Sequence, residues 1–497
     1  MNNIDSKQTN ELLVYRQKEN AVWAKGNADR ILEFYKTNTK PVSYATDRFL
    51  FWNWVGGINV PKLHYPAPEA LLNSVKSLLF SEDPTIEFVS EDENKHAKVN
   101  ELNDRLWQVF EDNDIDSIFQ NGAVMESYSG GLGFKFNIDT KLTNQPIIEL
   151  YPQERIELTT KYRRIVEIIF IDKYYKDKKE YTLKSIYGIG YIDFKLYNDK
   201  GVEVLLTTLE STRHLERKEF PQKVLMAVYK KNRTESIEFD SAYGGSDFEG
   251  IIDLFHQIDE IFSTMSLYIR RSRPILSLNE NMIPVSADGK AQIMPKEYEF
   301  DIVKLQRNSD AEKIENHIHR DIPELKLNEY INSIRLLQAS IYQKVGMDTT
   351  STNLEGVGAN QSGEALMQRE KSTVILYQNK VKGWKRAIKD LGYLSLIYQD
   401  IINHEVNDYE DYELNVGFPD YQSATFQDKV EMFTNAYKGL AVDLETMIKE
   451  IWSEDLTEEQ MEVMTRNVKL ENGIPILPDQ LGFEVSIDPE RDDAEWD

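Results

Sequence analysis

The residue types that could carry out catalysis or hold a cofactor do not fall into a catalytic spacing anywhere in the sequence. No Gly-x-x-x-x-Gly-Lys-Ser/Thr segment is present to hold phosphate, and the glycines of 129–133 predict only a turn between a helix and a strand. His317 and His319 stand two apart in a predicted helix, so they point to different faces and are rejected as a metal pair. The lack of cysteine excludes disulfides, thiolate metal sites and a cysteine nucleophile. The sequence therefore predicts no catalytic residue, no cofactor and no metal site.

The formal net charge of −26 argues against a protein that grips duplex DNA. Such proteins are basic, because the release of counterions from the phosphates drives their binding. Acidic walls would instead suit a passage through which DNA slides without sticking, because like charges repel across a narrow channel. A merely soluble acidic protein would have the same composition. The first twenty residues are polar, and the longest uncharged run, 49–61, is too short to cross a bilayer, so no membrane association is expected.

The elements that organise the chain are two predicted helices separated by a polar gap, between Leu325 and Asn403. Apolar residues of the first helix recur at three- and four-residue spacing: Leu327, Ile331, Ile334, Leu337, Ile341 and Val345. Gly346 ends this helix, and the gap at 347–361 contains two acidic residues and no lysine or arginine. The second helix begins at Ser362 and carries one apolar stripe, formed by Tyr377, Val381, Trp384, Ile388, Leu391 and Tyr398. At about 1.5 Å per residue it would be on the order of 60 Å long, more than an ordinary core requires.

Before this pair of helices the sequence predicts a helical start and then a β-rich region. Helices are expected over 1–38, 66–79 and 99–110, with a strand at 85–89. From Phe134 to about Lys230 apolar and polar residues alternate, which is typical of strands. Strands are predicted at 134–138, 146–151, 164–171, 181–186, 192–197, 202–206 and 224–229. The turn signal at 198–201 joins two of them, so a mostly antiparallel β subdomain is expected.

A further helix is predicted to open at the capping box Ser246-Asp247-Phe248-Glu249, where serine and glutamate satisfy each other's backbone donors. Its apolar residues have heptad-like spacing: Ile251, Phe255, Ile258, Phe262, Met265 and Ile269. It ends in the basic residues Arg270, Arg271 and Arg273, ahead of Pro274. Between the prolines at 274 and 323 the sequence predicts short strands at 275–278, 285–294 and 298–305 and a helix at 311–319. Two narrow apolar stripes that flank this small module predict side-by-side packing of copies around an axis.

The order of these segments resembles that of the portal proteins of tailed bacteriophages, most of all the portals of siphophages, over nearly the whole chain. The local likeness lies in the stretches 246–249, 361–366 and 417–419. The resemblance implies an α+β class and a mainly helical portal fold with a β-rich wing subdomain and a small α/β clip between two stem helices. It implies these boundaries: wing 1–245, first stem helix 246–273, clip 274–322, second stem helix 323–345, tunnel loop 346–362, long helix and remaining wing 363–424, crown and acidic tail 425–497.

The function that the resemblance implies is mechanical, and the chain is expected not to be an enzyme. Portal subunits form a ring, dodecameric in virions, at one capsid vertex, where DNA enters during packaging and leaves during ejection. The implied partners are further copies of the chain, double-stranded DNA, the terminase large subunit, the major capsid and scaffolding proteins and a head–tail adaptor. The implied location is the portal vertex of the virion, after assembly in the host cytoplasm. Two alternatives stay open: a carboxylate–metal nuclease or other DNA-processing enzyme, and another ring-forming virion adaptor.

Three groups of residues form the predicted site. The tunnel loop would line the DNA channel with Thr349, Thr350, Ser351, Thr352, Asn353, Leu354, Glu355, Val357 and Asn360. The basic cluster of Arg270, Arg271 and Arg273 would either face DNA or the motor, or pair with the helix dipole and acidic groups of a neighbouring copy. The stem packing set would seal copy to copy through Ile251, Phe255, Ile258, Phe262, Ile334, Leu337 and Ile341.

Overall fold

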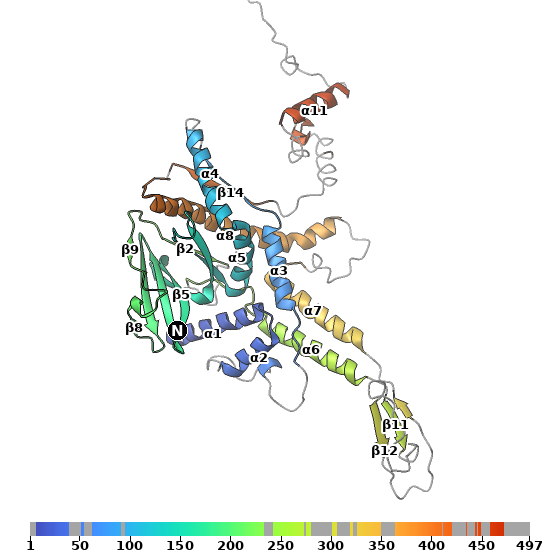
Figure 1. The fold of residues 1–497 in the computed structure, drawn as a ribbon. Helices are drawn as coiled ribbons and strands as arrows, with labels where there is room; N and C mark the ends of the chain where they lie inside the picture. Colours follow the sequence, from blue (N-terminus) through green and yellow to red (C-terminus); the bar gives the residue numbers. More distant parts are fainter. Residues whose placement is uncertain are drawn as a thin grey trace, which may run out of the picture. The chain divides into compact units, whose positions relative to one another are not determined.

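The computed structural model divides into two compact units, Met1–Phe418 and Pro419–Asp497. The structure describes residues 6–38, 51–53, 62–90, 95–232, 242–272, 275–279, 301–305, 319–321, 326–348, 363–409, 411–419, 434, 443–444, 446–448 and 458–471. The first unit is a mixed α+β structure in which helices pack against antiparallel sheets (Figure 1). This confirms the predicted α+β class.

The predicted helical start consists of two helices, α1 (Ser6–Ala24) and α2 (Ala28–Thr37). Between them Gly26 has a φ of +59°, a left-handed conformation that ends α1 without steric cost. The side-chain oxygen of Asn27 then accepts a hydrogen bond from the amide of Arg30 at 3.1 Å and caps α2. A glycine and a capping asparagine therefore divide one helical region in two.

Three helices form the framework of the first unit: α3 (Ala67–Phe80), α4 (His96–Asp112) and α5 (Ile115–Ser129). The first two were predicted with their ranges, whereas for α5 the sequence predicted only that a helix ends at the turn 129–133. Gly122 interrupts the apolar pattern of α5, and the structure gives the reason for the glycine. A Cβ at that position would lie 3.0 Å from atoms of Leu132 and Trp384, so the close packing of α5 on its neighbours requires the smallest residue.

Two antiparallel sheets fill the middle of the first unit, with strand orders β10-β2-β3 and β4-β5-β6-β7-β8, and β9 pairs with β7. Their strands are β2 (Gly131–Asn137), β3 (Ile147–Pro152), β4 (Ile156–Lys161), β5 (Arg164–Lys176), β6 (Lys179–Gly188), β7 (Tyr191–Asn198), β8 (Glu203–Val204), β9 (Lys218–Glu219) and β10 (Val228–Lys231). The predicted turn at 198–201 is confirmed, with Gly201 at a φ of +71° between β7 and β8. Strand β4 was missed, because its second half is exposed and polar and does not continue the alternation.

The turn predicted at 129–133 is also confirmed, because α5 ends at Ser129 and β2 begins at Gly131. Gly130 has a φ of +87°, and a Cβ there would lie 2.5 Å from the carbonyl oxygen of Gly244. Only glycine fits this turn. The close approach brings the end of α5 against the segment that leads into the next helix.

That next helix, α6 (Ile252–Arg271), begins later than the capping box predicts. The Ser246 hydroxyl donates to the carbonyl of Tyr128 at 2.6 Å and accepts from the amide of Phe248 at 3.0 Å, so it caps no helix. Gly250, at a φ of +79°, separates this turn from α6. The prediction of the helix start was wrong because the serine bonds the end of α5 instead of the amides of its own helix.

After α6 the described strands are β11 (Ile275–Asn279), β12 (Asp301–Leu305) and β13 (His319–Asp321), with β11 parallel to β12 and antiparallel to β13. The strands expected at 275–278 and within 298–305 are confirmed. His319, expected at the end of a helix, opens β13 instead, while the rest of that predicted helix with His317 and the strand predicted at 285–294 lie outside the described residues.

The helix pair that organises the chain is confirmed as α7 (Leu327–Val345) and α8 (Gly363–Asn403), and α8 has 41 residues. Gly346 ends α7 at a φ of +97°, as predicted. The strand β14 (Glu413–Gly417) pairs antiparallel with β1 (Thr85–Val89) and closes the first unit. In the second unit the structure describes the helix α11 (Glu458–Glu471).

Candidate functional site

The helices α6 and α7 pack against each other, and apolar side chains of both are buried inside the single chain. Phe255 and Ile258 of α6 and Ile334 and Ile341 of α7 are buried, and Ile251 lies just ahead of α6 and is buried as well. Figure 1 shows this pair leading away from the sheets toward β11 and β12. The pair is held at its middle and near its start by two clusters of buried polar groups.

The first cluster is centred on the carboxylate of Asp259, in the middle of α6. Its Oδ2 accepts from the Trp52 indole at 2.8 Å and lies 2.9 Å from His64 Nδ1, and its Oδ1 accepts from the amide of Tyr65 at 2.7 Å. Asp259 is buried, so these donors replace the water that the carboxylate loses. The Lys62 ammonium donates to the carbonyls of Phe51 and Trp52 at 2.8 and 3.0 Å. The described stretches 51–53 and 62–66, which precede α3, are thereby bound to α6 and to each other.

His256, also on α6, extends this cluster to α1 and α2. The Tyr35 hydroxyl donates to Glu19 at 2.7 Å and lies 3.0 Å from His256 Nε2. Because the hydroxyl proton goes to Glu19, Nε2 has to be the donor in the second contact, which assigns the proton of the imidazole to Nε2. Burial, followed by the charge of Glu19, raises the pKa of Tyr35 well above its ordinary value. The tyrosine therefore stays neutral and links three helices.

The second cluster lies just before α6 and ties it to the long helix α8. The Lys380 ammonium donates to Asp247 Oδ2 at 2.9 Å and to Asn232 Oδ1 at 2.6 Å. Asp247 also accepts from the hydroxyl of Ser127 at 2.7 Å and from the Asn232 amide at 3.1 Å. Lysine and aspartate are both buried, so each charge is compensated by the other. Four elements, α5, α8, the end of β10 and the approach to α6, meet at this ion pair.

A second buried ion pair, Lys230 with Glu126, lies on the same elements. The ammonium also sits 4.7 Å from the ring centroid of Trp384 on α8, a cation–π contact. Burial lowers the pKa of Lys230 to about 8, against the opposing effect of Glu126. The indole of Trp384 packs edge-on against Phe80 at 4.9 Å and against Phe119 at 5.9 Å. Trp384 is therefore the contact at which α8 meets α3, α5 and β10.

The C-terminal end of α8 is held by Asp400. Its two oxygens accept from Arg105 at 2.6 Å and from the Tyr409 hydroxyl at 2.6 Å. The Arg105 guanidinium also donates to Gln399 at 2.7 Å. Burial and then the hydrogen bond to Asp400 raise the pKa of Tyr409. The long helix is therefore held within the first unit by charged groups near its middle, at Lys380, and near its C-terminal end, at Asp400.

The nine predicted tunnel-loop residues, 349–355 with Val357 and Asn360, all lie outside the described residues, and so does Arg273. Arg271 is the last residue of α6. Arg270 is exposed. The roles assigned to the loop and to the basic cluster therefore stay predictions.

The stem packing set occupies a different place from the one expected. Ile251, Phe255, Ile258, Ile334 and Ile341 are buried within one copy, and Phe262 and Leu337 are half-buried. A side chain that the single chain already covers cannot seal a neighbour with the same surface. The described helix pair instead leaves other large apolar residues exposed: Ile269 at 45%, Ile331 at 39% and Leu336 at 69%.

Sequence reasoning missed the polar anchors of the helices, although a signal for them exists. Lys380 lies three residues after Tyr377 and four before Trp384, inside the apolar stripe of α8. Asp259 lies four residues after Phe255 and three before Phe262, inside the stripe of α6. A charge on the buried side of an amphipathic helix requires a partner of opposite charge or several hydrogen bonds. The stripe therefore indicates that such a partner exists, but it does not identify the partner, which comes from a distant segment.

Among the described residues, no group of three or more histidine, aspartate or glutamate side chains is arranged to hold a metal ion. None of the described helices has the length and apolarity needed to cross a membrane.

The described site is therefore a set of helices held together by buried polar groups. Comparison with known proteins gives the class of protein to which the chain belongs. A model of the phage portal protein family, SPP1 Gp6-like, matches residues 61–468. The chain belongs to this family of phage portal proteins. It is thereby a structural component of the virion and not an enzyme, which removes the nuclease alternative. No protein with a curated description matches the chain.

A solved structure similar to the chain is the neck of an empty GTA particle computed with C6 symmetry. The identity is 10% and the TM-score 0.41, over 83% of this chain and 91% of the other.

Proposed function

We propose that copies of this chain form a ring, a dodecamer in the virion, at one vertex of the capsid, and that DNA is packaged and ejected through its channel. The family match over 61–468 carries this proposal. It spans α6, α7 and α8, the helices that the sequence predicts to stand around a common axis. Assembly takes place in the host cytoplasm, and no ATPase activity is required of the ring itself, because the terminase motor supplies the energy.

The segments take distinct roles in the proposal. The clip docks the terminase large subunit, and the ring also contacts the major capsid and scaffolding proteins and the head–tail adaptor. The boundaries are wing 1–245, stem helices 246–273 and 323–345, clip 274–322, tunnel loop 346–362, long helix with remaining wing 363–424, and crown with acidic tail 425–497.

Neighbouring copies meet, in this proposal, on the exposed apolar residues of the helix pair. Ile269, Ile331 and Leu336 remain uncovered in one copy, whereas five members of the stem packing set are buried inside it: Ile251, Phe255, Ile258, Ile334 and Ile341. An adjoining copy packed on these side chains would remove their apolar area from water, which favours association. The inner stripe then keeps each subunit rigid, and the outer residues join the subunits.

The channel lets double-stranded DNA pass because its walls do not bind phosphate tightly. The chain has a net charge of −26, and the gap at 347–361 contains no lysine or arginine. Each bound phosphate would hold DNA back through counterion release, so a loop without cations lowers the resistance to sliding. The loop follows the duplex by shape and weak polar contacts.

Electron microscopy of the purified full chain tests the proposal directly. The expected result is a ring with a central hole, seen in top views as equal subunits around an axis. A protein that remains monomeric at all concentrations, and also with its capsid and scaffolding proteins present, would contradict the ring. Rings without a hole wide enough for duplex DNA would contradict the channel.

A further inference from the structure

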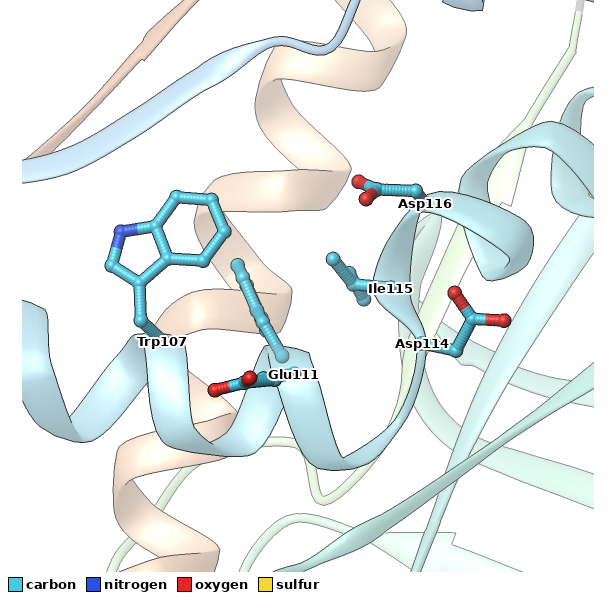
Figure 2. Close-up of a pocket in the computed structure, with 6 residues that line it drawn as sticks. Trp107, Glu111, Asp114, Ile115 and Asp116 are labelled. Carbon is cyan, nitrogen blue, oxygen red and sulfur yellow. The ribbon is translucent and has the colours of Figure 1, made fainter.

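A pocket of about 270 Å³ opens on the surface where α4 ends and α5 begins. It is lined by Trp107, Phe110, Glu111, Asp114, Ile115 and Asp116. Figure 2 shows the indole of Trp107 on one side of the hollow and Ile115 with Asp116 on the other. Phe110 and Ile115 are buried and form an apolar base, while Trp107 is 46% exposed. The pocket therefore combines an apolar base, an aromatic wall and an acidic rim.

The acidic rim is not neutralised within the described part of the chain. Glu111, Asp114 and Asp116 form no ion pair with any described lysine or arginine. Burial, and then the charges of Asp83 and Asp114, raises the pKa of Asp116, which shows that the carboxylates repel one another. A cation with an apolar stem would relieve the repulsion and cover the indole at the same time.

The same chain presents a segment with the complementary properties, the turn between β4 and β5. The turn consists of Lys161, Tyr162, Arg163 and Arg164, all exposed, and Tyr162 is 90% exposed. Tyr162 and Arg163 have φ values of 52° and 64°, which is the backbone of a tight type I′ hairpin turn. The Lys161 ammonium lies 5.8 Å from the ring centroid of Tyr162. The turn is therefore a preformed projection that carries one aromatic ring and three cations.

We propose that the β4–β5 turn of one copy docks into the α4–α5 pocket of the next copy. This inference rests on the proposed ring and names one of its subunit contacts. Guanidinium groups bind carboxylates through paired hydrogen bonds, and the exposed Trp107 offers its face to a cation or to the ring of Tyr162. Three acidic residues of the rim meet three basic residues of the turn. The turn does not occupy the pocket of its own copy, because Tyr162 is almost fully exposed there.

A second copy is favoured over another protein as the occupant for two reasons. A contact between two different patches of the same chain is heterologous, and repetition of such a contact around an axis produces a ring. The chain is strongly acidic, with 84 acidic and 58 basic residues, whereas the exposed turn 161–164 carries three cations and no carboxylate. In a closed ring of identical copies, the turn of each copy would then occupy the pocket of the next.

A zero-length cross-link on the unaltered protein tests the contact. Rings are assembled from equal amounts of ¹⁴N- and ¹⁵N-labelled chains and treated with a carbodiimide, which joins carboxylates to amines in direct contact. The expected product links Lys161 to Glu111, Asp114 or Asp116, with the two peptides carrying different isotopes in about half of the cases. Rings in which these carboxylates are joined only to other lysines, or to none, would overturn the proposal.

A charge exchange gives an independent measurement. Glu111→Arg with Asp116→Lys in the pocket, or Lys161→Glu with Arg164→Glu in the turn, each brings like charges together and should lower the fraction of chains in rings about tenfold or more. All four changes in one chain restore opposite charges, and ring assembly should recover. The matched control for the turn variant is Lys178→Glu with Lys179→Glu in the β5–β6 turn of the same sheet, which makes the same change in net charge and should leave the rings intact.

The outcomes separate this inference from the proposed function. A wild-type protein that never forms rings contradicts both. Wild-type rings that tolerate the pocket and turn variants as well as they tolerate the control contradict the docking contact alone. A reconstruction of the ring that shows the pocket facing solvent, or filled by a different protein, has the same consequence.

Discussion

Lys380 and Lys389 lie on the same long helix in opposite environments. Lys380 is buried against Asp247, whereas Lys389 pairs with Glu413 at the surface, at a similar distance of 2.9 Å. Removal of one partner of a buried pair leaves an uncompensated charge, which costs about 3–5 kcal/mol. A surface pair contributes about 0–1 kcal/mol, because water solvates either partner alone. We therefore expect Lys380→Met to lower the free energy of unfolding strongly and Lys389→Met to change it little.

Thermal and urea unfolding of the two methionine variants, followed by circular dichroism, measures this difference. The substitutions have the same size and polarity change and lie on the same helix, so Lys389→Met controls for the loss of a lysine from α8. If both variants unfold at the same urea concentration, the ion pair with Asp247 does not hold α8 in place.

Buried tyrosines make the first unit sensitive to alkaline pH. Burial, and then the charges of Glu149 and Asp172, raises the pKa of Tyr187, and its hydroxyl donates to the carbonyl of Phe136 at 2.8 Å. A raised folded pKa adds stability that is complete below the unfolded pKa of about 10 and is lost as the pH rises above it. Each such tyrosine contributes a loss of about 1.4 kcal/mol per pH unit in that range.

Tyr187→Phe tests this contribution through urea unfolding at a series of pH values from 8 to 11. At pH 8 the variant should be less stable by about 1 kcal/mol, because one hydrogen bond is lost. Above pH 10 the free energy of unfolding of the variant should fall less steeply with pH than that of the wild type. The difference in slope is that of one ionising group, about 1.4 kcal/mol per pH unit. Equal slopes for the two proteins would mean that Tyr187 ionises without unfolding.

Among the elements, the end of α7 depends on a single backbone conformation. Gly346 has a φ of +97°, and a Cβ there would meet only Leu376 at an ordinary contact distance of 3.9 Å. Gly346→Ala should therefore destabilise through backbone strain and not through a clash, by about 1–2 kcal/mol. Asparagine tolerates left-handed backbone better, so Gly346→Asn should cost clearly less. The urea unfolding midpoints of the two variants measure this difference. Equal losses of stability in both variants would indicate that side-chain crowding, and not backbone strain, dominates.

The elements with strong periodicity were predictable because each is specified by its own local sequence. The helix α8 and the strand β1 follow from apolar spacing, and the ends of α5 and α7 follow from glycines that adopt positive φ. The start of α6 was not predictable in this way. Ser246 has the local sequence of a capping residue, but its hydroxyl bonds α5, a partner that local sequence does not contain.

In the candidate site, too, the features that local sequence specifies were predicted and those that depend on distant partners were not. The sequence located the helix pair and the gap between its members, because spacing and turn residues are local features. It misassigned the stripe of Phe255 and Ile258 to a contact between copies, since an apolar face indicates burial but not what buries it. The joints at Asp247 and Asp259 could not be predicted, because their partners lie far away in the chain.

For the whole molecule, the buried joints and the acidic surface have complementary roles in the proposed ring. The ion pairs of Lys380, near the middle of α8, and of Asp400, near its C-terminal end, hold this helix within the first unit, and we expect them to resist its displacement during DNA passage. In that proposal, the acidic charge of the chain would keep DNA from adhering to the channel. The basic cluster at the end of α6 is the exception to this pattern, and it decides whether the ring contacts DNA or its motor through charge.

Replacement of Arg270, Arg271 and Arg273 by glutamine tests that role. If the cluster contacts DNA phosphates or the motor, the triple variant should form normal rings in electron micrographs yet package severalfold less DNA per capsid, because each lost cation removes a phosphate or carboxylate contact. Arg335→Gln is the control, since Arg335 is exposed on α7 and is not part of the cluster. Packaging equal to that of the wild type would mean that the arginines only pair with the helix dipole and with neighbouring acidic groups. Failure of the rings to assemble would mean that the arginines belong to the contact between subunits.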